Sequence, residues 1–335
     1  MINSNNHKTL LEARSISKHF ISPAKTGLFS KERFRALWDI NLEIGSGEKV
    51  GLIGRSGSGK STLIRCLAKL IEPDSGTINF KNTEITRMTA KEFRPLRKNL
   101  QVLFQNNYST LNPGMKVGQM LAEAAQLSGQ KSVSSKLINE QMQKVSLPIS
   151  LLGRYPKELS GGECRRIGVA IIDLLSPELL LADEPVTALD YINKCETISL
   201  FEKLNQEKGT AILFATHDLE AMAGFIKRVI VLFGGAVVEE FPFERLWQTC
   251  HPHTVELVRY HGFLKNIFTE KELSSYNKTK DEYAVGNQDA CVFINYCQRY
   301  RLAGKPEVCR KSQPALEQIE GEHYAACHYK GKVIE

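Results

Sequence analysis

The segment GRSGSGKST, residues 54–62, constrains the fold of this 335-residue chain more than any other feature. It matches the pattern of a phosphate-binding loop (P-loop), with Gly54, Gly59, Lys60 and Ser61 at the required positions. The preceding KVGLI is typical of a strand, and the following LIRCLAKL is typical of a helix. In such a loop, successive backbone N–H groups surround a phosphate at the positive end of the helix dipole. The sequence therefore predicts a nucleotide site between a strand and a helix.

Three nearly continuous apolar runs predict the centre of a parallel sheet. They are LLLA (179–182), AILFAT (211–216) and VIVLF (229–233). Runs of this length suit strands that helices cover on both faces, and helical patterns alternate with them. The predicted fold class is therefore α/β.

Other segments predict smaller structural units. Residues 36–53 indicate two strands around a Gly-Ser-Gly turn, and TINF (77–80) indicates a further short strand. Residues 117–147 are amphipathic and predict a helical insertion. The VVEEF run after a double glycine is expected to be an edge strand. The pattern stops after about residue 245, so the remaining tail is predicted to be a separate appendage.

Composition limits where the chain can act. At about 150 residues per domain, the length suggests two domains or one large domain with an appendage. The N-terminus MINSNNHK is polar, so no signal peptide is expected, and no apolar run reaches the roughly 18 residues that a membrane span needs. We therefore expect a reducing cytosolic environment, in which structural disulfides are uncommon. The net charge of +7 has no basic cluster of the kind that recognises nucleic acid.

Two adjacent carboxylates end one of the predicted buried strands. In LLLADEP, Asp183 is placed to hold a magnesium ion together with the Ser61 hydroxyl. Glu184 would polarise the attacking water as a general base. An Asp-Glu pair at a strand exit is common by itself, but downstream of a P-loop it predicts phosphate hydrolysis.

A second glycine-rich motif, LSGGE, precedes the helical stretch RRIGVAIIDLL. Ser160, Gly161 and Gly162 offer a hydroxyl and bare N–H groups at a helix N-terminus, which makes a second anion cradle. Two phosphate cradles in a chain with one P-loop make sense if each serves a different nucleotide.

With Gln105 in VLFQ, Asp190 in TALD and His217 in ATHD, these motifs strongly resemble those of an ABC-type ATPase subunit, in order and spacing, over roughly residues 10–240. The resemblance implies an ABC-type P-loop NTPase with a parallel core sheet, an antiparallel β subdomain and a helical subdomain at about 106–175. It implies an ATPase domain at 8–244 and a C-terminal extension at 245–335.

The resemblance also implies residue roles. Phe20 would stack on adenine, with a place in the core as the alternative, and His217 would contact the γ-phosphate. Asp190 would form the D-loop, and Gln105 would join Ser61 and Asp183 at the magnesium. The residues implied to contact ATP are Phe20, Gly54, Arg55, Ser56, Gly57, Ser58, Gly59, Lys60, Ser61, Thr62 and Gln105.

The resemblance implies that two such subunits sandwich ATP, with the P-loop of one facing the signature of the other. The signature here comprises Ser160, Gly161, Gly162 and Glu163. The fifth signature residue of the family is usually glutamine, so Glu163 adds a negative charge near a phosphate site.

Three further segments resemble peptide and nickel importer ATPases: the long first loop (20–40), YSTLNPGMKVGQ (108–119) and HPHTVELV (251–258). The chain is most similar to the second ATPase of a dipeptide or oligopeptide permease. The resemblance implies two transmembrane permease subunits, a paralogous ATPase and an extracytoplasmic solute-binding protein as partners. It also implies a peripheral position on the cytoplasmic face of the cell membrane.

Other functions remain open at this point. Similar subunits serve nickel, metallophore and glutathione importers. A soluble ABC protein acting on DNA or ribosomes is a more remote alternative, because neither a second cassette nor a long coiled-coil insertion is visible. A non-hydrolysing regulatory subunit conflicts with the presence of Glu184 and His217.

Half of the eight cysteines lie in the tail: Cys291, Cys297, Cys309 and Cys327. Their gaps match no common short zinc motif, but the polar tail could hardly bury four thiols by packing alone. Four thiolates suit a 4Fe–4S cluster or tetrahedral zinc, and the resemblance implies the iron–sulfur cluster. Absence of any metal is the third alternative. Cys66, Cys164 and Cys195, within helical patterns, are expected to be ordinary buried thiols.

Overall fold

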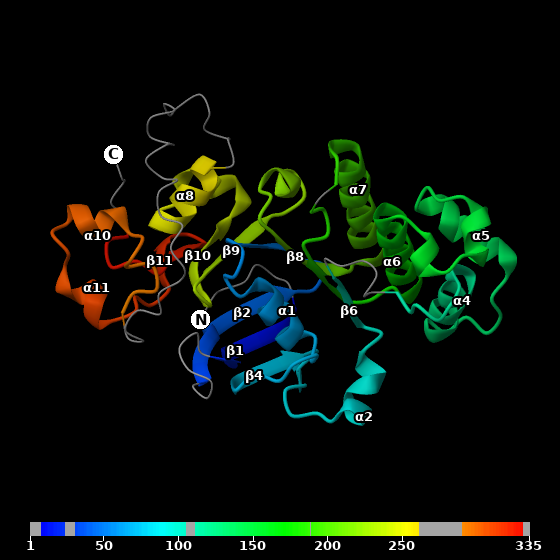
Figure 1. Cartoon of the computed structure of the whole chain (residues 1–335), viewed down its shortest axis with the longest axis horizontal. Coiled ribbons are helices and arrows are strands. Elements are labelled where there is room, and N and C mark those ends of the chain that lie inside the picture. Colours follow the sequence, from blue (N-terminus) through cyan, green and yellow to red (C-terminus); the bar gives the residue numbers. More distant parts are fainter. Residues whose placement is uncertain (1–7, 24–30, 105–110, 188, 261–289, 331–335) are drawn as a thin grey trace.

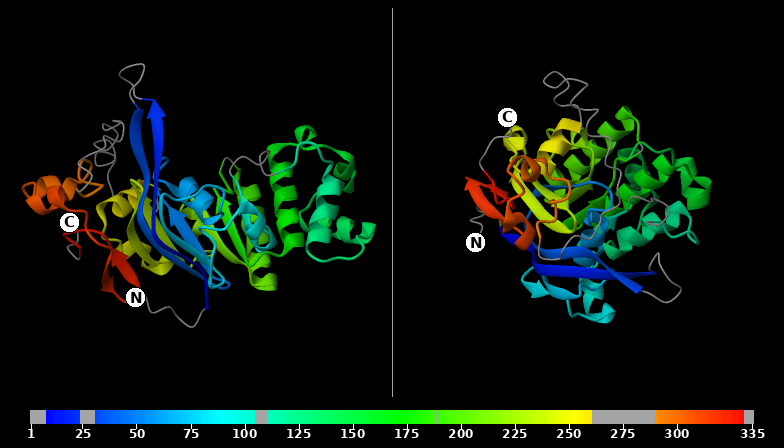
Figure 2. Two further views of the ribbon diagram at one scale, coloured as in Figure 1. Left: turned by 90° about the horizontal axis from the view of Figure 1, so that it is seen from below. Right: turned by 60° about the vertical axis from the view of Figure 1, so that its left-hand side comes forward.

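The computed structural model describes residues 8–23, 31–104, 111–187, 189–260 and 290–330. These residues form a large central sheet, a smaller sheet beside it and a helical layer at one end, while the C-terminal tail lies at the opposite end (Figure 1). Figure 2 shows the long β1–β2 hairpin of the smaller sheet extending away from the central sheet.

The central sheet has eight strands in the order β11-β12-β10-β9-β3-β8-β7-β6. β6, β7, β8, β3 and β9 pair in parallel, whereas β10, β12 and β11 pair antiparallel. The bounds are β3 (Lys49–Ile53), β6 (Leu100–Leu103), β7 (Leu179–Asp183), β8 (Ala211–Thr216), β9 (Arg228–Phe233), β10 (Ala236–Pro242), β11 (Glu317–Glu320) and β12 (His323–Ala325).

The smaller sheet is antiparallel, with the order β2-β1-β4-β5. Its strands are β1 (Thr9–Pro23), β2 (Lys31–Gly45), β4 (Ser75–Phe80) and β5 (Thr83–Glu84). Gly45 ends β2 and Lys49 begins β3, so the predicted pair of strands around the Gly-Ser-Gly turn is confirmed, although the two strands belong to different sheets.

The α-helices are α1 (Lys60–Leu67), α2 (Ala90–Phe93), α4 (Val117–Leu127), α5 (Ser135–Lys144), α6 (Gly161–Leu175), α7 (Tyr191–Lys208), α8 (Pro252–Tyr260), α10 (Gln298–Leu302) and α11 (Glu307–Lys311). Short 3₁₀ helices span Arg94–Leu96, Ile149–Gly153, Pro156–Glu158, Glu220–Met222 and Phe243–Gln248. The helical insertion predicted at 117–147 is confirmed as α4 and α5.

The alternating faces of the parallel strands explain their continuous apolar sequences. Leu179 and Leu181 of β7 pack with α1 and the smaller sheet, whereas Leu180 and Ala182 pack on the other face with α7. Because both faces are covered, no position of β7 can be polar until its last residue, Asp183. A third apolar cluster lies inside the layer of α4, α5 and α6.

The tail is joined to the central sheet more closely than its composition suggests. β10, which contains VVEEF, was expected at an edge, but β12 pairs with it through Glu239↔Ala325 and Glu240↔Tyr324. That prediction was wrong because β12 and β11 have only three and four residues, too short for a strand signal. The boundary between 244 and 245 stays a prediction.

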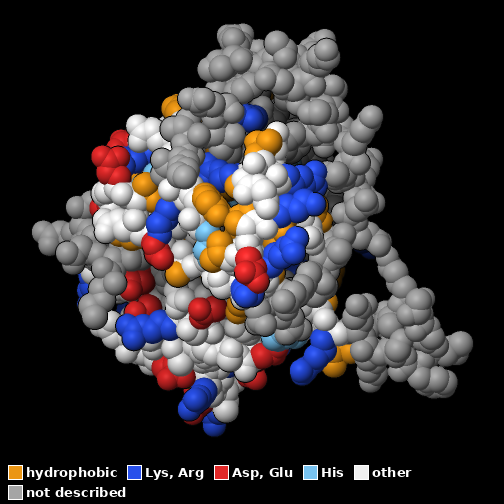
Figure 3. All heavy atoms as spheres, turned by 90° about the vertical axis from the view of Figure 1, so that its left-hand side faces the viewer, with side chains coloured by type: hydrophobic (Ala, Val, Ile, Leu, Met, Phe, Trp, Pro, Cys, Tyr) orange, Lys and Arg blue, Asp and Glu red, His pale blue; other side chains and the backbone are white. Residues whose placement is uncertain are grey.

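The face formed by the tail is chemically mixed. Figure 3 shows basic, acidic and hydrophobic side chains interspersed on it. α10 and α11 contribute basic residues to their last turns, while Leu302 and Val308 are exposed. Among the residues that the structure describes, no helix combines the length and the apolar character needed to cross a bilayer.

Candidate functional site

The P-loop connects β3 to α1 and needs glycine at two close backbone approaches. Gly59 has φ +108°, and a Cβ there would lie 2.7 Å from the Ala36 carbonyl oxygen. A Cβ on Gly54 would lie 2.4 Å from the Leu232 carbonyl oxygen. Both contacts are too short for any side chain, so the loop conformation depends on these two glycines.

Lys60, the first residue of α1, is buried and folds back over the loop. Its Nζ donates to the Gly54 carbonyl at 2.7 Å and to the Arg55 carbonyl at 3.3 Å. It also lies 3.7 Å from Glu184 Oε1. Burial lowers the pKa of Lys60, while Glu184 and Asp183 act in the opposite direction. A buried cation at the mouth of the loop is the group that outer phosphates require.

Asp183 ends β7 beside the P-loop. Its carboxylate accepts from the Ser61 side chain, while its buried Oδ1 has no hydrogen-bond partner among the described residues. Burial is the main cause that raises the pKa of Asp183. A buried carboxylate oxygen with free capacity, next to a hydroxyl, is the donor set that a magnesium ion uses, so these residues fit that ion.

Glu184 is held by several polar groups. Its Oε2 accepts from Thr187 Oγ1 at 2.5 Å and lies 2.9 Å from His217 Nδ1. The Glu184 backbone adopts φ +52° and donates its N–H to the Ala215 carbonyl at 2.8 Å. A non-glycine residue in this conformation costs about 1–3 kcal/mol and is concentrated at functional sites. Thr187 was missed from the sequence, although its spacing of three residues from Glu184 is visible there.

His217 follows β8 at the same edge of the sheet. Its side chain is 51% exposed, compared with 11% for Glu184. The imidazole therefore covers the buried carboxylate from the solvent side. The predicted catalytic pair, Glu184 and His217, is brought together by the structure.

The signature motif lies at the start of α6, in the helical layer (Figure 1). Ser160 is the N-cap, and Glu163 completes a capping box with it. Glu163 Oε2 accepts from the Ser160 N–H at 2.7 Å and from its Oγ at 2.8 Å. The Ser160 backbone N–H is the main cause that lowers the pKa of Glu163. The Ser160 hydroxyl, which was predicted to form part of the second anion cradle, thus already donates a hydrogen bond to the Glu163 carboxylate.

The remaining predicted residues lie around these groups. Asp190 is the exposed N-cap of α7 and accepts from the Asn193 N–H at 3.0 Å. Phe20 is 41% exposed on β1, so its alternative place in the core is wrong. Gln105 lies outside the described residues. In the P-loop, Arg55, Ser56 and Gly57 are exposed, Ser58 is buried and Thr62 is half-buried.

The four tail cysteines lie around one cavity. Cys291, Cys297, Cys309 and Cys327 line it together with Phe293 and Ile294. The pKa of Cys291 is raised to about 12, mainly by burial, and the other three thiols act in the same direction. No three of these four Sγ atoms all lie within 4.8 Å of one another. Among the described residues, one other group of metal-ligating side chains is that close together.

The expectation for the other thiols is correct at two positions. Cys66 and Cys164 are buried. Cys195 is exposed on α7, so its expected burial was wrong, because its position lies on the solvent side of that helix. Cys250, which drew no attention in the sequence, lies beside Glu239 and His323.

Comparison with known proteins agrees with this geometry. Residues 37–187 match the family model described as "ABC transporter". The chain is 30% identical to the oligopeptide transport ATP-binding protein OppF of Haemophilus influenzae, over 97% of this chain and 98% of the relative. It is 32% identical to the oligopeptide transport ATP-binding protein AppF of Bacillus subtilis, over 96% and 98%.

Solved structures show the same architecture. A dimeric ATP-binding cassette in a post-hydrolysis state, bound to ADP and phosphate, matches with a TM-score of 0.62 and 28% identity. The match covers 70% of this chain and 99% of that chain. The buried Lys60 and the carboxylates at the end of β7 agree with a cassette of this kind. The chain therefore belongs to the family of ABC transporter ATP-binding proteins, as its near-full-length similarity to the two oligopeptide transport relatives shows.

Proposed function

We propose that the chain is the ATP-hydrolysing subunit of a membrane importer of di- or oligopeptides. We infer di- or oligopeptides as the solute from the near-full-length similarity to two proteins named as oligopeptide transport ATP-binding proteins. The proposed partners are two permease subunits, a paralogous ATPase and, indirectly, an extracytoplasmic solute-binding protein. The chain would act at the cytoplasmic face of the cell membrane.

Each residue of the site would have a separate role in ATP hydrolysis. Lys60 and the P-loop N–H groups would hold the outer phosphates. Ser61 and Asp183 would hold magnesium, with Gln105 as a further proposed ligand, and the ion would neutralise phosphate charge. Glu184 would accept the proton of the attacking water, and His217 would orient the γ-phosphate beside it. Phe20 would stack on adenine, for which its exposed ring on β1 is available.

A second subunit would complete the site. Gly161 and Gly162 face open space, because a Cβ at either would meet no atom within 4 Å. Next to Asp190, the side chains of Tyr191 and Ile192 are 80% and 70% exposed. Adjacent exposed apolar side chains are typical of an interface. This supports a dimer in which the signature and D-loop of one subunit approach the P-loop of another.

The four tail cysteines would hold a 4Fe–4S cluster that fastens the tail. With Zn–S bonds of about 2.3 Å, tetrahedral zinc would bring the sulfurs to about 3.8 Å from one another. No three of the four Sγ atoms all lie within even 4.8 Å of one another, which supports the larger cluster over a single zinc ion. The Tyr300 N–H donates to Cys297 Sγ at 3.3 Å, and Arg299 Nη1 lies 3.7 Å from Cys327 Sγ. Such donors stabilise thiolate ligands of a cluster. Zinc remains the alternative occupant.

The first prediction concerns the general base. We expect Glu184→Gln to keep ATP binding and to lower ATP hydrolysis by about 10²–10⁴-fold, since one general base contributes about that much. Hydrolysis and nucleotide affinity should be measured in parallel. Glu178→Gln, just before the other end of β7, is the matched control and should leave both unchanged. Near-normal turnover by Glu184→Gln would remove Glu184 from this role.

The second prediction concerns the acidic signature residue. Glu163→Gln should raise ATP hydrolysis by the complete complex by up to about fivefold, because it removes a negative charge near the proposed phosphate site. A charge at a helix terminus contributes about 0.3–1 kcal/mol. Glutamine can still close the capping box, so the helix start is kept. Glu158→Gln is the control, because Glu158 accepts from the Tyr155 N–H at 2.7 Å in a similar cap. Equal effects of the two substitutions would contradict a role for the Glu163 charge.

The third prediction tests the transported solute. The chain, purified with its co-encoded permease and ATPase partners in lipid nanodiscs, should hydrolyse ATP faster when binding protein and di- or oligopeptides are added. Nickel, a metallophore and glutathione should be tested in the same assay. Stimulation by one of these and not by peptides would move the function to that importer class, and stimulation by no solute would contradict an importer role.

The fourth prediction concerns the tail cysteines. Anaerobically purified protein should be brown and contain iron and acid-labile sulfide, and Cys297→Ser should lose both. Cys195→Ser, at an exposed thiol of α7, should keep them. Zinc that is present in the wild-type protein and lost in Cys297→Ser would favour zinc over the 4Fe–4S cluster at the four cysteines. Folded protein in which no metal depends on Cys297 would overturn the proposal.

A further inference from the structure

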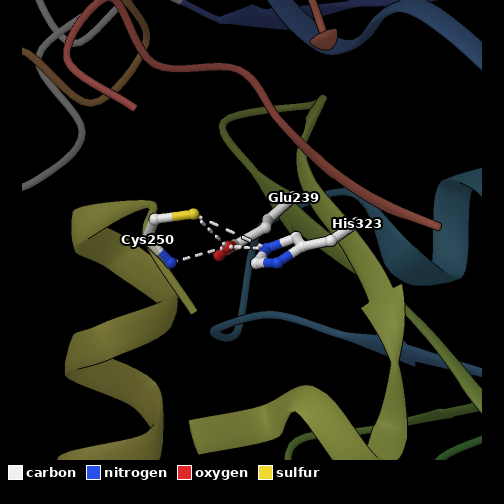
Figure 4. A group of neighbouring side chains, drawn as sticks. All are labelled: Glu239, Cys250 and His323. Carbon is white, nitrogen blue, oxygen red and sulfur yellow. Dashed lines mark hydrogen bonds and ion pairs between the residues drawn. The ribbon is translucent and has the colours of Figure 1, made fainter. Parts of the chain in front are cut away.

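A second group of metal-binding side chains lies outside the nucleotide site and outside the four-cysteine cavity. Glu239 belongs to β10, Cys250 precedes α8, and His323 is the first residue of β12. Their side chains point toward one another from three different segments, of which β12 is far from the other two in the sequence (Figure 4). None of the three takes part in the proposed ATP hydrolysis.

The donor atoms lie close together. His323 Nε2 is 2.8 Å from Glu239 Oε1 and 3.6 Å from Cys250 Sγ, and Sγ is 3.4 Å from Oε1. In a tetrahedral zinc site, bond lengths of about 2.3 Å to sulfur and 2.0–2.2 Å to nitrogen and oxygen place the sulfur about 3.5 Å from the other two ligands. The nitrogen and oxygen would be about 3.3 Å apart. Only that edge would have to widen, by about 0.5 Å, to receive the ion.

The surroundings hold the ligands in this arrangement. Glu239 is completely buried and His323 is 3% exposed. The Cys250 N–H donates to Glu239 Oε1 at 2.7 Å, and the His251 N–H donates to Oε2 at 3.2 Å. The His323 ring packs edge-on against Phe241 at 5.7 Å. Outer contacts of this kind orient metal ligands, and the half-buried Cys250 is the most accessible of the three.

We propose that Glu239, Cys250 and His323 bind one divalent cation of the zinc class. The mixture of thiolate, imidazole and carboxylate favours zinc over magnesium or calcium, which select oxygen ligands. Three protein ligands leave the fourth position to water. The ion would fasten the segment before α8 and the strand β12 to β10 of the ATPase core. A purely hydrogen-bonded cluster of the same three residues is the competing explanation.

The test measures metal in the full-length chain. Purified wild-type protein should contain about one zinc ion per chain that persists in Cys297→Ser and is lost in Cys250→Ser and Cys250→Ala. In metal-stripped protein, added Co²⁺ should produce a thiolate-to-cobalt charge-transfer band with the same dependence on Cys250. His323→Gln should weaken the affinity for Co²⁺ by at least about 10–100-fold. Cys195→Ser is the matched control, and circular dichroism with ATP binding verifies that each variant folds.

Two results would overturn the proposal. Folded wild-type protein that contains no zinc and gives no thiolate–cobalt band would establish the hydrogen-bonded cluster instead. Zinc or a cobalt band that disappears with Cys297→Ser but persists with Cys250→Ser would assign the metal to the four-cysteine cavity. Since iron and sulfide are measured separately, the failure of this site is distinguishable from the failure of the proposed cluster.

Discussion

Parallel pairing of β3, β8 and β7 is the constraint on which the rest of the site depends. Ile53 pairs with Thr216, and Asp183 pairs with Ala215, so the three strands end at one edge of the sheet. The residues that follow each strand must therefore meet there, and these are the P-loop, Glu184 and His217. The P-loop lies more than 100 residues before Glu184 in the chain, and His217 lies 33 residues after Glu184. The pairing of the strands therefore brings the three segments together, although no local sequence signal encodes the contact between them.

The site concentrates charge that burial makes unfavourable unless it is compensated. Burial lowers the pKa of Lys60 and raises that of Asp183, so each group alone would tend toward its neutral form. The neighbouring opposite charges act against these shifts. Lys60 Nζ is 3.7 Å from Glu184 Oε1, so in the proposed mechanism the outer phosphates and the Glu184 carboxylate would share this cation. The strained backbone of Glu184 indicates that its position is imposed by the surrounding sheet.

The features that the sequence does predict have local signals. The P-loop glycines, the apolar run that ends in Asp183, and the helical periodicity of 117–147 each depend on neighbouring residues. The missed features depend on distant ones. β12 has only three residues and forms by pairing with β10. The exposure of Cys195 depends on which face of α7 meets the core, and α7 has no clear apolar stripe. Glu239, Cys250 and His323 are separated by 11 and 73 residues.

The tail shows how a segment with little apolar content can still have a fixed structure. Its helices α10 and α11 have five residues each, and its strands have four and three, so none would be stable alone. Backbone pairing with β10 supplies one attachment, and Phe293 packing against Phe233 of β9 at 4.9 Å supplies another. Cross-links compensate for a small core in other short domains. The two metal sites proposed above, one in the four-cysteine cavity and one at Glu239, Cys250 and His323, would be cross-links of this kind.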